Sequence, residues 1–324
     1  MHRALLIQEI VQLIMQNLYH DSEGFNPYQK GRMALYNAAL TCSYFLVGAL
    51  DVLWWASPLC LNYYQERCVV FLVLLRNFLN VVQHNILCGP ISKCDLRRFD
   101  MYASRIRRYF YQRLDADEDI NISAYVHVIQ ASGRFCILPR LLNLTVWEGN
   151  KDGADATKIM YLLSPCLHKF VMYASSTRTA IVLDSLQITV PRISCLTLNA
   201  VAFDNHCLSV ICSLSQLEEI YICEDDHFEG RPRPEPSNFD FSFFPCLSCK
   251  ETLQTFRLDW LHIMWSDAST TTVDFPSLKF LTVHSTSIGP IAYFFGYVMV
   301  PGLQKLSIRL GPSPFRELIK STEV

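Results

Sequence analysis

The sequence lacks a long apolar run, a glycine-rich loop and a charge excess of one sign. Its most apolar stretch is the eight-residue CVVFLVLL, 68–75, whereas a membrane-spanning helix takes about 20 residues; it predicts a buried helix instead. The 324 residues include only 12 glycines, and no phosphate-binding glycine motif occurs. With 28 basic and 30 acidic residues, the net charge of −2 gives no overall attraction to nucleic acid or to an anionic membrane.

Catalytic and metal-binding motifs are also missing. The sequence contains neither a Gly-x-Ser-x-Gly elbow nor a His-Glu-x-x-His zinc motif. Cys246 and Cys249 form one Cys-x-x-Cys pair, and only His262 lies near enough to add a ligand. A structural zinc ion takes four protein ligands. We therefore expect no enzyme activity, no cofactor and no metal.

Two further compositional features bear on location and partners. The 13 cysteines, an odd number, are scattered without tight pairing, which suits a reducing compartment such as the cytoplasm or the nucleus. Six arginines lie between Arg97 and Arg113, interleaved with aromatic residues, which is a pattern seen in nucleic-acid binding. Four acidic residues follow at 115–119. We interpret the segment as a self-compensated surface and expect neither nucleic acid nor membrane as a partner.

A repeated motif occupies the second half of the chain. It consists of a proline or small residue, one variable residue, a leucine, two variable residues, and two apolar residues that flank another variable one. Its first apolar anchors are Leu141, Leu167, Ile193, Leu217, Leu253, Leu278 and Leu303, with steps of 26, 26, 24, 36, 25 and 25 residues. The long step contains an acidic, proline-rich insertion, 224–240, which predicts a surface loop between repeats.

Each copy of this motif predicts one short strand followed by a return segment. The strands are expected to be adjacent, parallel and in chain order, at 143–147, 169–173, 195–199, 219–223, 255–259, 280–284 and 305–309. Helical returns are expected at 154–164, at 205–215 and from residue 289. An earlier copy, RIRRYFY from Arg105, lies 35 residues before the first anchor, and its register stays open.

The apolar anchors of these strands point inward, so the alternate side chains form columns on the opposite face of the sheet. Aromatic residues and arginine are the usual anchors of protein interfaces. On this face they are Trp147, Tyr173, Tyr221, Arg257 and Phe280. We expect these five residues to bind a target protein.

The N-terminal segment predicts three short amphipathic helices. The first has apolar residues at helical spacing, namely Leu6, Ile10, Leu13, Ile14 and Leu18. A loop with Gly24, Pro27 and Gly31 follows, and then helices over 32–42 and 43–54. Such a small unit needs a partner or a neighbouring domain for stability. The sequence divides into a helical unit at 1–55, a helical linker or first irregular repeat at 56–135, and the repeats at 136–324.

Two family resemblances follow from these motifs. Leu6, Glu9 and Ile10 match the opening of an F-box of the kind common in mushroom-forming fungi, and Cys42 and the run 49–54 match its end. Ile7 stands where this family usually has proline. The period and the L-x-x-L-x-L core resemble leucine-rich repeats, without the usual ladder asparagine. The resemblance implies an α/β fold: a three-helix F-box-like unit followed by an irregular leucine-rich-repeat solenoid with a parallel sheet.

The resemblance also implies a function. An F-box docks on a Skp-type adaptor, and through it on a cullin, while the repeats bind the protein to be ubiquitinated; this protein would be the substrate receptor of an SCF-type ubiquitin ligase. The implied adaptor-binding residues are Leu6, Glu9, Ile10, Leu13, Ile14, Leu18, Leu50, Leu53 and Trp54. The alternative is a scaffold outside the ubiquitin system whose N-terminal helices only cap the repeats. The two readings differ in what Leu6, Ile10 and Ile14 contact.

Overall fold

A computed structural model describes residues 7–20, 27–55, 82–83, 86–87, 91–112, 121–147, 156–173, 176–199, 205–223, 243–259, 272–285 and 288–310. The chain divides into two compact units. One contains Met1–Leu144 and Tyr161–Cys166, and the other contains Thr145–Met160 and Leu167–Val324. The helix expected at 68–75 and the insertion at 224–240 lie outside the described residues.

The first unit begins with three helices, α1 (Gln8–His20), α2 (Pro27–Thr41) and α3 (Ser43–Trp55). Their shared core consists of Val11, Met15, Leu35, Ala49 and Val52. Gly48 allows α3 to approach α1 closely, because a Cβ at this position would lie 3.0 Å from Val11 Cγ1.

The prediction of a loop around Pro27 and Gly31 is wrong, because α2 already begins at Pro27. Proline suits the first position of a helix, where its fixed φ is helical and its missing N–H has no partner to lose.

The rest of the first unit contains a short antiparallel pair, two helices and the start of the sheet. These elements are β1 (Val82–Gln83), β2 (Ile86–Leu87), α5 (Lys93–Ala103), β3 (Arg108–Gln112) and α6 (Ile122–Ser132). Both helices have N-caps: the Ser92 side chain accepts a hydrogen bond from Asp95 N, and the Asn121 side chain accepts one from Ser123 N. Gly133 ends α6 with a φ of 65°, a conformation that favours glycine.

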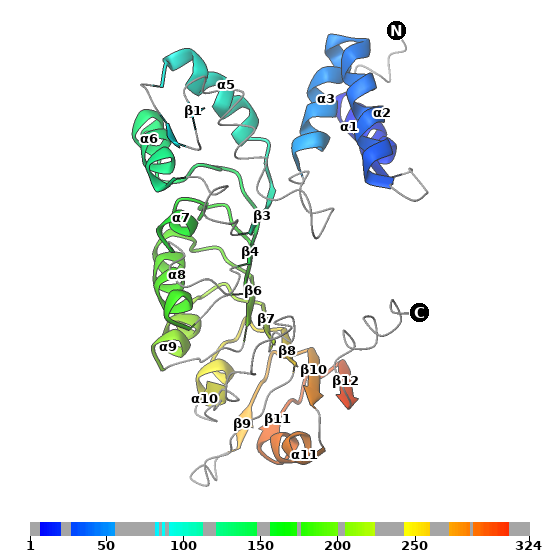
Figure 1. Cartoon of the computed structure of the whole chain (residues 1–324). Coiled ribbons are helices and arrows are strands. Elements are labelled where there is room, and N and C mark those ends of the chain that lie inside the picture. Colours follow the sequence, from blue (N-terminus) through cyan, green and yellow to red (C-terminus); the bar gives the residue numbers. More distant parts are fainter. Residues whose placement is uncertain are drawn as a thin grey trace, which may run out of the picture. The chain divides into compact units, whose positions relative to one another are not determined.

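An eight-stranded sheet runs through the chain in the order β12-β10-β8-β7-β6-β5-β4-β3 (Figure 1). Its remaining strands are β4 (Asn143–Trp147), β5 (Lys169–Tyr173), β6 (Cys195–Asn199), β7 (Glu219–Cys223), β8 (Thr255–Asp259), β10 (Phe280–Ser285) and β12 (Lys305–Leu310). From β5 to β12 each neighbouring pair is parallel. The seven expected strands are therefore confirmed in position and in order, and the fold is mixed α/β with a mostly parallel sheet.

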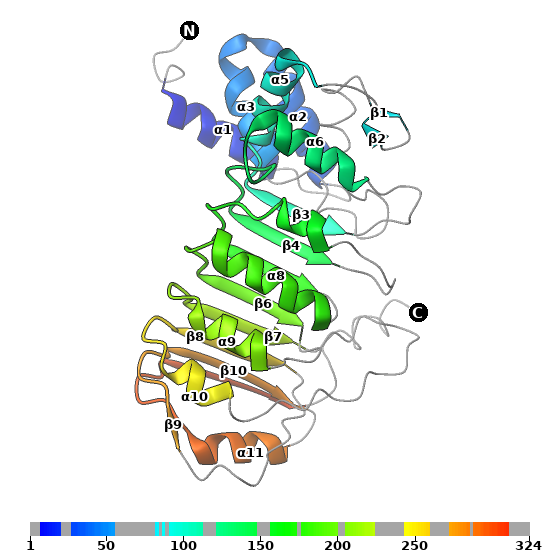
Figure 2. The same ribbon diagram turned by 90° about the vertical axis from the view of Figure 1, so that its left-hand side faces the viewer.

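Helices connect these strands in the second unit. They are α7 (Ala156–Met160), α8 (Ser176–Thr189), α9 (Asn205–Ser213), α10 (Phe243–Ser248) and α11 (Ile288–Tyr297). Figures 1 and 2 show α8, α9 and α10 on one face of the strands β6–β8. Two short strands, β9 (Val273–Asp274) and β11 (Val298–Met299), form a separate parallel pair. Within the described ranges, no helix combines the length and the apolar character needed to cross a membrane.

Where a copy of the repeat motif begins with proline, this residue has a structural role in the turn before the strand. The anchor N–H of Ile193 donates to Val190 O over 3.4 Å, and that of Leu278 donates to Phe275 O over 3.4 Å. Pro191 and Pro276 occupy the second position of these turns, where the fixed φ of proline is already correct. The turn directs the following residues into the sheet.

Backbone hydrogen bonds also fix the register of the earliest copy. In later copies one carbonyl before a strand accepts two N–H groups of the next repeat, as His168 O does from Ser194 N at 3.0 Å and Cys195 N at 2.9 Å. The carbonyl of Arg107 accepts in the same way from residues 142 and 143, at 2.8 and 2.9 Å. Residue 107 therefore corresponds to residue 142 of the next copy.

This correspondence makes Ile106, Tyr109 and Tyr111 the apolar anchors of the earliest copy, whose strand is β3. All three residues are buried.

The apolar anchors of the inner strands are buried on one face of the sheet, and on the opposite face Val171, Thr197 and His284 are buried as well. In β6 the anchors Leu196 and Leu198 are buried, whereas Lys169 in β5 and Glu219 in β7 are exposed at positions that flank Cys195. The apolar anchors of β6–β8 pack beneath α8, α9 and α10, which lie on that face of the sheet. The opposite face carries the columns that the sequence predicted.

Candidate functional site

The first candidate surface lies on α1, where the sequence placed adaptor-binding residues. Leu13 is 58% exposed, and Leu18 is also exposed, as is Glu9. Ile10 and Ile14 are half-buried. Leu6 lies outside the described residues. The residues of α1 that lie in the core of the three helices are Val11 and Met15 instead.

The three expected residues of α3 have different surroundings. Leu53 packs against the core of the three helices. Leu50 is half-buried. The ring of Trp54 lies 5.2 Å from that of Tyr102 in α5, centroid to centroid. Leu53 and Trp54 are thus engaged within the first unit.

Sequence reasoning missed an apolar row on α2. Met33, Tyr36 and Leu40 are all exposed, and Leu40 reaches 68%. Their spacing of three and four residues puts them on one side of the helix, away from the core residue Leu35. This spacing is visible in the sequence and could have predicted the exposed row. On α3, Tyr44, Leu46 and Val47 are also exposed, so each of the three helices keeps apolar side chains outside the shared core.

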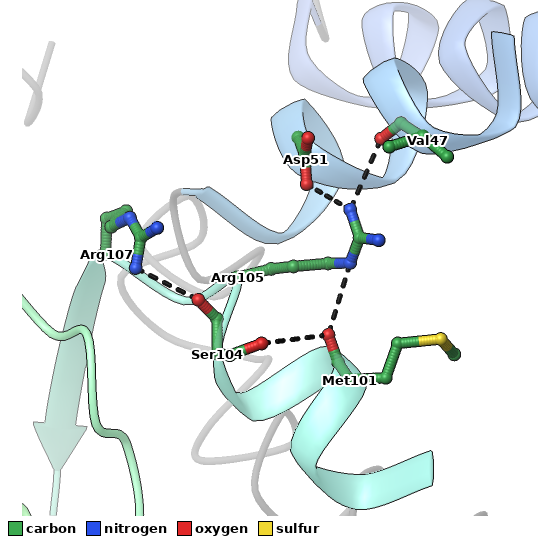
Figure 3. Close-up of polar contacts among 6 residues, drawn as sticks. All are labelled: Val47, Asp51, Met101, Ser104, Arg105 and Arg107. Atoms are coloured by element: carbon green, nitrogen blue, oxygen red, sulfur yellow. Dashed lines mark hydrogen bonds and ion pairs between the residues drawn. The ribbon is translucent and has the colours of Figure 1, made fainter. Parts of the chain in front are cut away.

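Arg105 connects α3 to the segment that follows α5 (Figure 3). Its Nη1 forms an ion pair with the Asp51 carboxylate and donates to Val47 O at 3.3 Å. Its Nε donates to Met101 O at 3.2 Å. Its neighbour Arg107 donates to Ser104 O at 2.9 Å. Arg105 and Arg107, two of the clustered arginines, therefore form hydrogen bonds and an ion pair within the protein.

Desolvation by burial lowers the pKa of Arg107, and the positive charge of Arg140 lowers it further.

The second candidate surface is the sheet face opposite the helices. Pairing places Val171, Thr197, Tyr221, Arg257, Thr282 and Ser307 side by side on consecutive strands. The guanidinium carbon of Arg257 lies 4.3 Å from the ring centroid of Tyr221, a cation–π contact that holds both groups in place. Phe280 is 41% exposed in the neighbouring column.

The two other expected target-binding residues lie at strand ends. Tyr173 is half-buried at the end of β5, and Trp147 ends β4, with its side chain outside the described residues. The structure therefore brings Tyr221, Arg257 and Phe280 together on three neighbouring strands.

Burial raises the thiol pKa of two half-buried cysteines, Cys195 and Cys212. Burial raises the pKa of Cys195 to about 11, with Lys169 acting against this shift and Glu219 adding to it. Burial and the neighbouring Cys246 thiol raise the pKa of Cys212 to about 12. Among the described residues, no group of three or more histidine, cysteine or acidic side chains is arranged to hold a metal ion. His262 lies outside those residues.

Comparison with known proteins gives no family. No protein-family model matches the chain, and no curated protein matches it.

Proposed function

We propose that this protein is the substrate-recognition subunit of an SCF-type ubiquitin ligase. In this proposal α1–α3 form an F-box that docks on a Skp-type adaptor and through it on a cullin. The strands β3–β12 and their helices form an irregular leucine-rich-repeat solenoid that binds the target protein. The role is non-enzymatic: the protein holds two others together.

One observation carries the proposal. The three N-terminal helices bury one set of apolar side chains against each other and expose a second set, which includes Leu13, Leu40 and Val47. Burying an exposed aliphatic side chain contributes about 1.5–3 kcal/mol. Apolar rows on a small helical unit therefore favour a protein partner.

The target site in this proposal is the part of the sheet face opposite the helices where Tyr221, Arg257 and Phe280 lie on neighbouring strands. Tyr221 and Arg257 are already held together there, so binding costs little further side-chain ordering. Phe280 adds an exposed aromatic ring one strand away from Arg257. These residue types commonly dominate interface energies.

A second candidate function is a scaffold outside the ubiquitin system whose helices only cap the repeats. The contacts of α3 with the α5 region favour it: Arg105 pairs with Asp51, and Trp54 lies against Tyr102. In this reading the helices serve to cover the first repeat. They need no adaptor.

Calorimetric titration of the full chain with a purified Skp-type adaptor separates the two candidates. The proposal predicts binding by the wild type and a loss of at least about tenfold in affinity for Leu13→Asp. The matched control is Ile188→Asp on α8, because Ile188 is 82% exposed and lies outside the three helices. Absence of binding by the wild type, or equal effects of both variants, contradicts the adaptor role.

A further inference from the structure

The apolar anchors of the last strand, β12, differ from those of all inner strands. Leu306, Ile308 and Leu310 are 43%, 44% and 55% exposed. Their register neighbours in β10, Leu281 and Val283, are 1% and 4% exposed. The same repeat motif thus produces a buried row in the interior of the sheet and an exposed row at its end.

β12 is the last strand of the sheet in the part of the chain that the structure describes. Within the described ranges it pairs with β10 alone. The N–H and C=O groups on the other side of such an edge strand are available to another extended segment. A segment that adds there would continue the ladder by main-chain hydrogen bonds.

The other face of β12 carries positive charge. Lys305 and Arg309 are exposed and flank Ser307 at alternate positions. An added strand places successive side chains on opposite faces, so one set would lie beside these cations and the other beside the exposed leucines and isoleucine. The edge therefore selects for acidic residues on one face of the incoming segment and apolar residues on the other.

The same charges argue against a second copy of this chain as the occupant. Antiparallel pairing of two β12 strands about Ser307 would set Lys305 of each copy opposite Arg309 of the other. Like charges directly opposite each other on paired strands are destabilising. The occupant must bring the opposite charge.

We propose that the outer edge of β12 binds, by strand addition, an extended segment of a partner protein in which apolar and acidic residues alternate. This site goes beyond the proposed function, because it uses neither the exposed residues of α1–α3 nor the contact between Tyr221 and Arg257. It holds whether or not the helices bind an adaptor.

Fluorescence anisotropy with the full chain tests the proposal. The probe is a labelled peptide in which valine and glutamate alternate. It has about nine residues, the length of a long strand. The wild type binds it. The double variant Lys305→Glu, Arg309→Glu loses at least about tenfold in affinity. The matched control is Lys169→Glu, which reverses an exposed lysine in the same column on β5 and leaves binding unchanged.

Two further arms separate strand addition from simple attraction between charges. The same peptide with an N-methyl group on every backbone amide keeps its side chains but donates no ladder hydrogen bond from either edge, and it does not bind. Ile308→Asp weakens binding, whereas Ile188→Asp on α8 does not.

The proposal is overturned if the wild type does not bind the alternating peptide, or if the N-methylated peptide binds equally well. It is also overturned if a phosphorylated peptide without apolar residues or an RNA oligonucleotide competes better than the alternating peptide. Self-association of the chain that Ile308→Asp abolishes would assign the edge to a second copy instead. The peptide arms use the wild-type protein, so they decide the question even if a variant fails to fold.

Discussion

Replacing Arg105 by methionine tests the link between α3 and the α5 region. Methionine keeps most of the side-chain length and removes the guanidinium. The lost contacts are the ion pair with Asp51 and the hydrogen bonds to the carbonyls of Val47 and Met101. The side chains of Arg105 and Asp51 are 17% and 33% exposed, so their pairing is partly screened by water.

The magnitude follows from these contacts. A partly exposed ion pair contributes about 0.5–1 kcal/mol, and each hydrogen bond to a carbonyl contributes about 0.5–1.5 kcal/mol. The two carbonyl bonds are long, at 3.2 and 3.3 Å, so we place them at the lower end. Arg105→Met should cost about 1.5–2.5 kcal/mol of local stability.

The assay is native-state hydrogen exchange of the α3 amides in a double-mutant cycle with Asp51→Asn. The two single changes should be non-additive by about 0.5–1 kcal/mol, because each removes the same ion pair. Thr41→Ala in α2 is a control, since its hydroxyl donates to Asn37 O of its own helix. A coupling below about 0.3 kcal/mol would show that the ion pair does not hold α3 in solution.

Three other predictions concern the core, the helix contact and the thiols. Leu196→Ala should lower the free energy of unfolding by about 2–5 kcal/mol in urea, because Leu196 is fully buried; a cost below about 1 kcal/mol would contradict its place in the core. Gly48→Val should destabilise α1–α3 by about 1–3 kcal/mol, seen as faster exchange of α1 amides, since Val11 leaves no room for the added methyl groups. Burial holds the pKa of Cys212 at about 12, so this thiol stays protonated near about pH 8 and should resist iodoacetamide while the exposed Cys246 is labelled. Equal labelling rates of Cys212 and Cys246 would contradict the buried environment of Cys212.

The sheet could be predicted because each strand carries its own local signals. A turn with proline or a small residue, a buried leucine and two alternating apolar residues recur together, and the structure shows why. Pro191 presets the turn, and Leu196 and Leu198 pack beneath the helices. The register of β3 could not be predicted, because its copy lies 35 residues before the next one. The paired hydrogen bonds to Arg107 O supply this register.

Other features depend on tertiary context that the sequence does not contain. The apolar residues of α1 cover a broad arc, so helical spacing alone does not reveal that Val11 and Met15 face the core while Leu13 faces outward. The exposure of Leu306 was equally hidden. Its repeat motif is the same as that of the inner strands, and only its position at the end of the sheet differs.

The measurement that tests the central claim most directly is affinity purification of the full chain from cells, followed by mass spectrometry. The wild type should capture a Skp-type adaptor and a cullin together with a target protein. Leu13→Asp should lose the adaptor and cullin but keep the target. Arg257→Ala should keep the adaptor and cullin but lose the target. Capture of a target by the wild type with no adaptor or cullin would contradict the ubiquitin-ligase role and favour the scaffold.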